Sequence, residues 1–102
     1  MNENNDARVS RVRQMETTLN EGAAALHALT DALDRVEALR PRMAELFQYY
    51  GSEAWHEDRE AELPADLPAG VLSEDAVYDL LTDTREEAIH MLEVSAGLLK
   101  SI

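Results

Sequence analysis

Two long stretches of the chain repeat apolar residues with the period of a helix that packs against another helix. Steps of three and four residues alternate in both stretches, which is the heptad period. The first stretch, here called the first seam, consists of Val12, Met15, Leu19, Gly22, Leu26, Leu29, Leu33 and Val36. The second seam consists of Val77, Leu81, Thr84, Ala88, Met91, Ser95, Leu98 and Ile102. Alanine, leucine, glutamate and arginine, which favour helices, surround both seams. The pattern predicts an all-α fold with long helices over about 6–40 and 74–101.

Proline, glycine and serine residues predict where the helices end and begin. Pro41 cannot donate a hydrogen bond to the carbonyl of Glu37. The apolar phase nevertheless continues beyond it, so we expect a helix over 42–50 and leave open a kink or a tight bend at Pro41. Gly51 suits the position after a helix, and Ser52 can cap a short helix over 53–61. The two prolines and the glycine of 62–72 predict a loop, after which Ser73 caps the last helix.

The matched seams predict an antiparallel hairpin of the two long helices, with the short helical segment in the turn. We expect residues 1–102 to form a single all-helical domain. A two-helix hairpin leaves its apolar flanks uncovered, so we expect a second copy to complete a helical bundle as a homodimer. A compact monomer whose short helix and loop cover the seam is the alternative. Gly22 is either a tolerated defect or a point of close helix approach.

Composition excludes several classes of function. The chain has 102 residues, a formal net charge of −12 and no cysteine. The negative charge argues against direct binding of nucleic acid phosphates. Without cysteine there is no disulfide, thiolate metal site or thiol nucleophile. We see no signal peptide, and no apolar run is long enough to span a membrane.

Candidate chemistry is sparse. Glu53–His56 and Glu87–His90 share the Glu-x-x-His spacing found in di-iron carboxylate bundles. Neither histidine lies on a seam, whereas that chemistry needs ligands that face inward. His27 is expected to be a structural or interface residue that pairs with Asp31. We therefore predict no catalytic residue, no cofactor and no metal site, and expect that the protein is not an enzyme.

Most of the aromatic residues gather in the predicted turn. The candidate interaction patch, here called the aromatic patch, consists of Tyr49, Tyr50, Trp55, Val71 and Tyr78. Tyrosine and tryptophan are favoured anchors of binding sites. The alternative interpretation is structural, in which these residues fix the direction of the returning helix.

Two sequence blocks carry a resemblance to a known family. They are Tyr49-Tyr50-Gly51-Ser52-Glu53-Ala54-Trp55 and Gly70-Val71-Leu72-Ser73-Glu74-Asp75-Ala76-Val77-Tyr78-Asp79-Leu80-Leu81. With Arg11-Val12-Arg13-Gln14-Met15-Glu16, they resemble domain of unknown function 4298, a family of small bacterial proteins. The resemblance covers nearly the whole chain and implies a cytoplasmic, all-helical bacterial protein. It implies no activity and no catalytic residues.

These observations leave three hypotheses for the function. The first is a non-catalytic protein–protein interaction or regulatory module with an unidentified protein partner. The second is an acidic mimic of nucleic acid, because Asp79, Asp83, Glu86 and Glu87 form a row of acids on one helix. The third is a metal-binding carboxylate bundle, which the outward position of the histidines disfavours.

Overall fold

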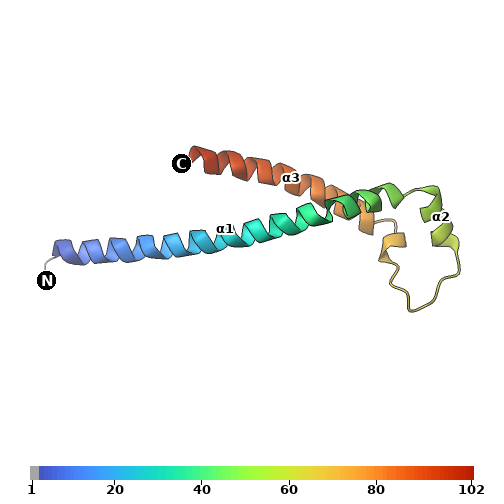
Figure 1. Ribbon diagram of the computed structural model, residues 1–102, viewed down its shortest axis with the longest axis horizontal. Coiled ribbons are helices and arrows are strands. Elements are labelled where there is room, and N and C mark those ends of the chain that lie inside the picture. The colour runs from blue at the N-terminus through green and yellow to red at the C-terminus, as the bar shows by residue number, and fades with distance from the viewer. Residues whose placement is uncertain (1–2) are drawn as a thin grey trace. The chain divides into compact units, whose positions relative to one another are not determined.

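The computed structural model describes residues 3–102 and confirms the all-α fold. Its elements are α1 (Glu3–Tyr49), α2 (Glu53–Glu60), the 3₁₀ turn η1 (Gly70–Leu72) and α3 (Ala76–Lys100). The part of the chain that the structure describes contains no strand. The chain divides into two compact units, residues 1–40 and residues 41–102, which are described separately below. Figure 1 shows the order of the elements.

The first helix continues through Pro41. Helices over 6–40 and 42–50 were expected, but α1 is one helix of 47 residues with Pro41 inside it. A proline within a helix removes one hydrogen bond, that to the residue four positions earlier. Arginine and leucine, which favour helices, lie immediately before the proline, and the helix resumes after it. Of the two possibilities left open at Pro41, the structure excludes two helices that meet at a tight bend, because α1 is continuous.

The first seam is exposed in a single chain. Residues 3–40 lie entirely within α1, and no residue of α1 is buried. The seven large side chains of the first seam keep 39–64% of their surface accessible. An amphipathic helix of this kind is stabilised mainly when its apolar face packs against another element. Within the first unit, the first seam therefore has no core to face.

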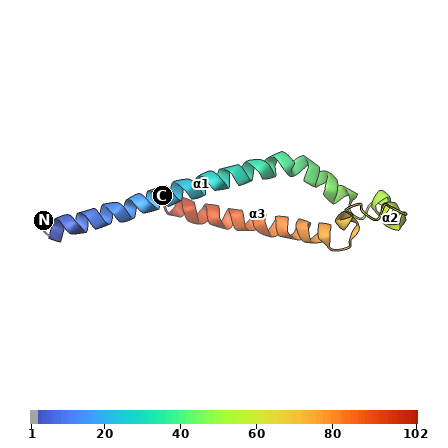
Figure 2. The same cartoon turned by 90° about the horizontal axis from the view of Figure 1, so that it is seen from below.

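The second unit has a small core at the turn. Trp55 of α2 is 4% exposed and Val77 of α3 is 3% exposed, and they are the two buried hydrophobic residues of the described chain. Phe47, Tyr50 and Leu81 are half-buried. Figures 1 and 2 show residues 61–69 as an open loop that leaves α2 and returns through η1 to the start of α3. The core therefore joins the segments on either side of this loop.

The turn residues act largely as the sequence predicts. Gly51 has a φ of 77°, the left-handed conformation that glycine adopts without a steric penalty. Ser52 caps α2, because its side chain accepts a hydrogen bond from the backbone N–H of Trp55. The Ser73 hydroxyl accepts from the N–H of Ala76 at 3.1 Å and donates to the Gly70 carbonyl at 2.8 Å. The expected cap position differs, because α3 begins at Ala76 and its N-cap is Asp75, two residues after Ser73. The expected loop 62–72 differs at its end, where η1 forms one 3₁₀ turn.

Candidate functional site

The turn end of the second unit contains the most elaborate side-chain arrangement of the chain. Its centre is the indole of Trp55, whose Nε1–H donates to the carbonyl oxygen of Val71 at 2.9 Å. The ring of Tyr50 packs edge-on against the indole, with ring centroids 5.2 Å apart and an interplanar angle of 68°. The guanidinium carbon of Arg59 lies 5.2 Å from the centroid of the same indole. Trp55 of α2 thus contacts Tyr50, the residue that follows α1, and Val71 of η1.

Two tyrosine hydroxyls extend these contacts. The hydroxyl of Tyr50 donates to the backbone carbonyl of Glu74 at 2.6 Å, across 24 residues of sequence. The hydroxyl of Tyr49 donates to Oδ2 of Asp58, also at 2.6 Å. This hydrogen bond to a carboxylate raises the pKa of Tyr49 above its ordinary value, and partial desolvation and the negative charge of Asp58 act in the same direction. Both tyrosines are therefore held by specific partners.

A single basic residue links α2 to the segment before α3. Arg59 is the one base among the acids of residues 52–66. Its guanidinium lies 3.3 Å from Oε1 of Glu74 while it also covers the face of Trp55. Both partners of this ion pair are partly exposed, so its contribution to stability is small. The pair connects the side chain of Glu74 to the guanidinium that covers the indole.

The structure brings four of the five residues of the aromatic patch together, and it buries the central one. Trp55 is buried, while Tyr49, Tyr50 and Val71 are half-buried around it. Tyr78 is 58% exposed and no hydrogen bond or ring contact joins it to the other four. Trp55 therefore offers little surface to a partner, which favours the structural interpretation of these residues. Whether the patch binds a protein stays a prediction.

The residues that complete this arrangement were not singled out from the sequence. Asp58 accepts the hydrogen bond from Tyr49, and Arg59 covers the ring of Trp55. The backbone carbonyl of Glu74 accepts the hydrogen bond from Tyr50. One signal was available for Arg59, because it is the only base in an acidic segment. Asp58 and Glu74 give no such signal, since many other acids surround them in the sequence.

An apolar hollow of about 230 Å³ lies beside this arrangement, within the second unit. One wall carries the Tyr49–Asp58 pair, and the rest comes from the loop and η1. Its lining residues are Tyr49, Asp58, Leu63, Leu67, Pro68, Ala69, Val71 and Leu72. Leu63 and Leu67 are exposed at its edge. The hollow presents apolar surface with one carboxylate, and it holds no group with the geometry of a nucleophile and base.

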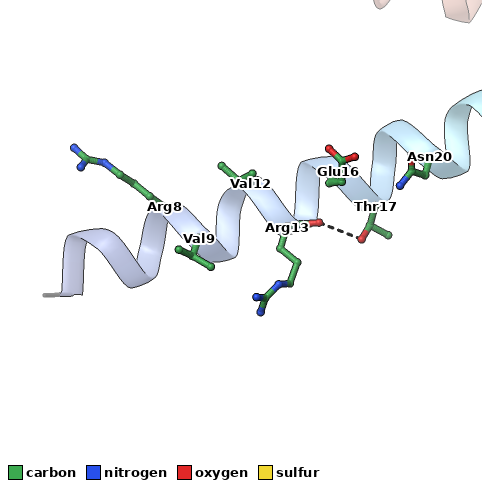
Figure 3. A pocket seen from close by; sticks show the side chains of 7 residues that line it. All are labelled: Arg8, Val9, Val12, Arg13, Glu16, Thr17 and Asn20. Atoms are coloured by element: carbon green, nitrogen blue, oxygen red, sulfur yellow. Dashed lines mark hydrogen bonds between the residues drawn. The ribbon is translucent and has the colours of Figure 1, made fainter. Parts of the chain in front are cut away.

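A second hollow lies on the first unit, along the amino-terminal turns of α1. Its lining residues are Arg8, Val9, Val12, Arg13, Glu16, Thr17 and Asn20. Figure 3 shows Arg8 and Arg13 extending away from the helix, and the hydroxyl of Thr17 bonded to the carbonyl of Arg13 at 3.1 Å. Val12 places this hollow at the start of the first seam. It is an open helix surface with basic side chains at its edges.

The histidines form local pairs. Nδ1 of His90 lies 3.0 Å from Oε1 of Glu87, and Nε2 of His27 lies 3.6 Å from Oδ2 of Asp31. The hydrogen bond and the negative charge of Glu87 raise the pKa of His90. The other Glu-x-x-His histidine, His56, packs edge-on against the Trp55 ring at 4.9 Å. Among residues 3–102, no three or more histidine or acidic side chains converge in a way that could hold a metal ion.

The two sequence blocks around the turn contain the residues that separate the helices of the second unit. Gly51 and Ser52 separate α1 from α2, and Gly70 and Ser73 shape the return into α3. No helix in the described part of the chain is both long enough and apolar enough to cross a membrane. A comparison with curated proteins gives no match. The family model of DUF4298, a domain of unknown function, matches residues 12–94, a range that includes the first seam and both blocks. The chain therefore belongs to the DUF4298 family.

Proposed function

We propose that this protein is a small, non-catalytic interaction module that binds protein helices through the apolar faces of its own helices. The single observation that carries the proposal is the exposure of the first seam, whose large side chains are 39–64% accessible. Contiguous apolar surface of this extent on a protein that is not spanning a membrane marks an interaction site. A narrow heptad stripe is complementary to another helix.

The small size of the core supports the same proposal. Two hydrophobic side chains are buried among the described residues, and both belong to the second unit. An isolated helix is marginally stable in water unless its apolar face is covered. A helical partner would supply the cover that the first seam lacks. The second seam offers a further apolar face, since Met91 and Leu98 of α3 are exposed.

The expected homodimer and the antiparallel pairing of residues 6–40 with 74–101 belong to this proposal. A hairpin would cover one side of each long helix, and a second copy would cover the remainder as a helical bundle. We also place the protein in the bacterial cytoplasm, following the family resemblance. We also propose that the protein has no catalytic role, and the structural contacts that occupy the tyrosines and Trp55 at the turn support this.

A pair of matched variants tests the proposal. Leu26→Glu places a carboxylate on the first seam, whereas Ala24→Glu places the same group on the opposite face of the same turn. We expect Leu26→Glu to weaken association by tenfold or more, about 1.4 kcal/mol, and Ala24→Glu to leave it unchanged. Size-exclusion chromatography with light scattering measures self-association, and affinity purification from the host measures binding of other proteins. Equal behaviour of both variants and the wild type in both assays would contradict the proposal.

The salt dependence of partner binding separates this proposal from the nucleic-acid mimic. Asp79, Asp83 and Glu86 of α3 are exposed and could face a basic groove. Binding through apolar seams depends weakly on salt, whereas binding through a row of carboxylates falls steeply as salt screens the charges. A steep fall that Leu26→Glu does not alter would favour the mimic.

A further inference from the structure

The first seam has a twofold symmetry in its own spacing. Read from either end, its positions follow the same steps of three and four residues, and the midpoint falls at Ala24. All of its residues lie within the first unit, on one uninterrupted helix. A stripe with this symmetry can meet a second copy of itself running in the opposite direction, with every position opposite another seam position. The sizes of the side chains that such a pairing brings together determine how well it packs.

An antiparallel pairing centred at Ala24 matches large residues with small ones at the centre. It places Val12 opposite Val36 of the partner subunit and Leu19 opposite Leu29 of the partner subunit. Met15 lies opposite the partner's Leu33. At the centre, Gly22 lies opposite the partner's Leu26. A Cβ at Gly22 would meet no atom within 4 Å in the single chain, so the space beside it is open. The missing side chain of Gly22 thus provides room for the partner's leucine, twice in each pair.

The parallel alternative leaves the centre of the interface empty. It stacks each seam residue on its own copy, so that Gly22 faces Gly22 of the partner subunit and one layer has no side chains. Its advantage is an attraction between Arg11 and Glu16 of the partner subunit, formed twice. Each exposed ion pair changes an equilibrium constant by up to about fivefold, so the two pairs together give less than about thirtyfold. A core layer that loses its large side chains costs about thirtyfold or more. The antiparallel pairing is therefore favoured.

The residues beside the seam fit the same arrangement. Ala23 and Ala25 flank the midpoint, and each would lie near its own copy, so that small side chains let the two helices approach closely. Beyond the seam, Arg8 would lie opposite Arg40 of the partner subunit, which ends the apolar contact by charge repulsion. The seven large side chains of the first seam, each 39–64% exposed in the single chain, form the surface that the pair would cover.

We propose that residues 12–36 of α1 form an antiparallel, twofold-symmetric pair with the same residues of a second copy, with Leu26 of each copy filling the gap at Gly22 of the other. This inference rests on the proposed function and specifies its first partner. It replaces the pairing of residues 6–40 with 74–101 along the first seam, because a narrow heptad stripe faces one helix. It assigns a role to Gly22, for which the sequence alone left two explanations open.

Distances between spin labels test the direction of the pair. The chain has no cysteine, so Ala24→Cys and Ala38→Cys each introduce one labelling site. Both alanines are exposed and occupy equivalent heptad positions on the face opposite the seam. In the antiparallel pair the two labels at 24 lie at the same height, whereas those at 38 are separated by about 42 Å along the axis. Equal distances at the two sites would show a parallel pair and overturn the proposal.

Gly22→Leu provides a second test whose sign differs between the arrangements. Leucine favours an isolated helix over glycine, and in a parallel pair it would fill the empty layer and strengthen association. In the antiparallel pair it would collide with the partner's Leu26, and we expect association to weaken by tenfold or more. Gly97→Leu, an exposed glycine of α3, controls for the gain in helix propensity. Strengthened association of Gly22→Leu would overturn the proposal.

The outcomes separate this inference from the proposed function. If the full chain is monomeric by light scattering at all concentrations and no distance between labels is observed, the inference is wrong. If Leu26→Glu then still abolishes the capture of another protein from the host, the proposed function stands with a different helical partner. If neither self-association nor capture depends on the first seam, both proposals are wrong.

Discussion

We expect the indole of Trp55 to hold α1, α2 and η1 together, and its replacement tests this directly. It is one of two buried hydrophobic side chains among the described residues. Its Nε1–H bonds the Val71 carbonyl at 2.9 Å, and its ring contacts Tyr50 and Arg59. Trp55→Ala removes all three contacts, while Trp55→Phe keeps an aromatic ring and removes the hydrogen bond.

The magnitudes follow from these contacts. Truncation of a buried tryptophan to alanine costs about 3–5 kcal/mol. Loss of one hydrogen bond to a carbonyl costs about 0.5–1.5 kcal/mol, so we expect a loss of about 1–2 kcal/mol for Trp55→Phe, including the smaller ring. Since the core of the second unit has so few members, the alanine variant should open the α2–η1 segment even where the long helices persist.

Hydrogen exchange and urea unfolding measure the two effects. In Trp55→Ala, amides of residues 53–73 should exchange rapidly, and the free energy of unfolding from circular dichroism should fall by the amount given above. Tyr78→Ala serves as the control, because Tyr78 is exposed and should cost less than about 0.5 kcal/mol. If Trp55→Ala costs no more than Tyr78→Ala, or leaves the exchange of residues 53–73 unchanged, the reasoning is refuted.

Three further predictions concern the cap and the titrating groups. Ser52→Ala should cost about 1 kcal/mol by removing the α2 cap, and a urea midpoint equal to that of the wild type would contradict this. Asp58→Ala should lower the pKa of Tyr49 toward 10.0 in an ultraviolet titration, and an unchanged titration would argue against the bond. Because the pKa of Tyr49 is raised in the folded protein, the stabilisation from this bond is present below pH 10 and is lost as pH rises through the folded pKa. Glu87→Gln should lower the pKa of His90 toward 6.5 by NMR. The stabilisation from the Glu87–His90 pair is complete below that value and disappears as pH rises through the raised pKa, so greater α3 stability in alkaline solution than in acid would count against it.

The helices and their ends could be predicted because they depend on local chemistry. A glycine at φ 77° and two serine hydroxyls that accept backbone N–H groups each act within three residues of their own position. The path of the chain through Pro41 was harder to predict, since proline penalises a helix that its neighbours favour. The continuing apolar phase at Met43 and Leu46 was the better guide, and α1 does continue.

The burial of Trp55 could not be predicted, because it depends on contacts across the loop. The Trp55–Val71 bond spans 16 residues and the Tyr50–Glu74 bond spans 24. A sequence pattern shows that these residues are aromatic and close to turns, but it does not show which of them the loop encloses. For the two seams, the sequence predicts the helices but not the surface that they contact. Their period predicts helices with apolar faces, yet a stripe alone does not identify the surface that covers it.

The two side-chain hydrogen bonds that span the most residues of sequence determine which substitutions the turn tolerates. Both the Trp55 indole and the Tyr50 hydroxyl bond main-chain oxygens, those of Val71 and Glu74. Every amino acid carries a main-chain oxygen, so side chains along the loop can be exchanged without loss of either acceptor. The path and length of the loop backbone are constrained, because they position both of these oxygens. Substitutions in this loop can therefore change its chemical groups while Trp55 and Tyr50 keep their main-chain acceptors.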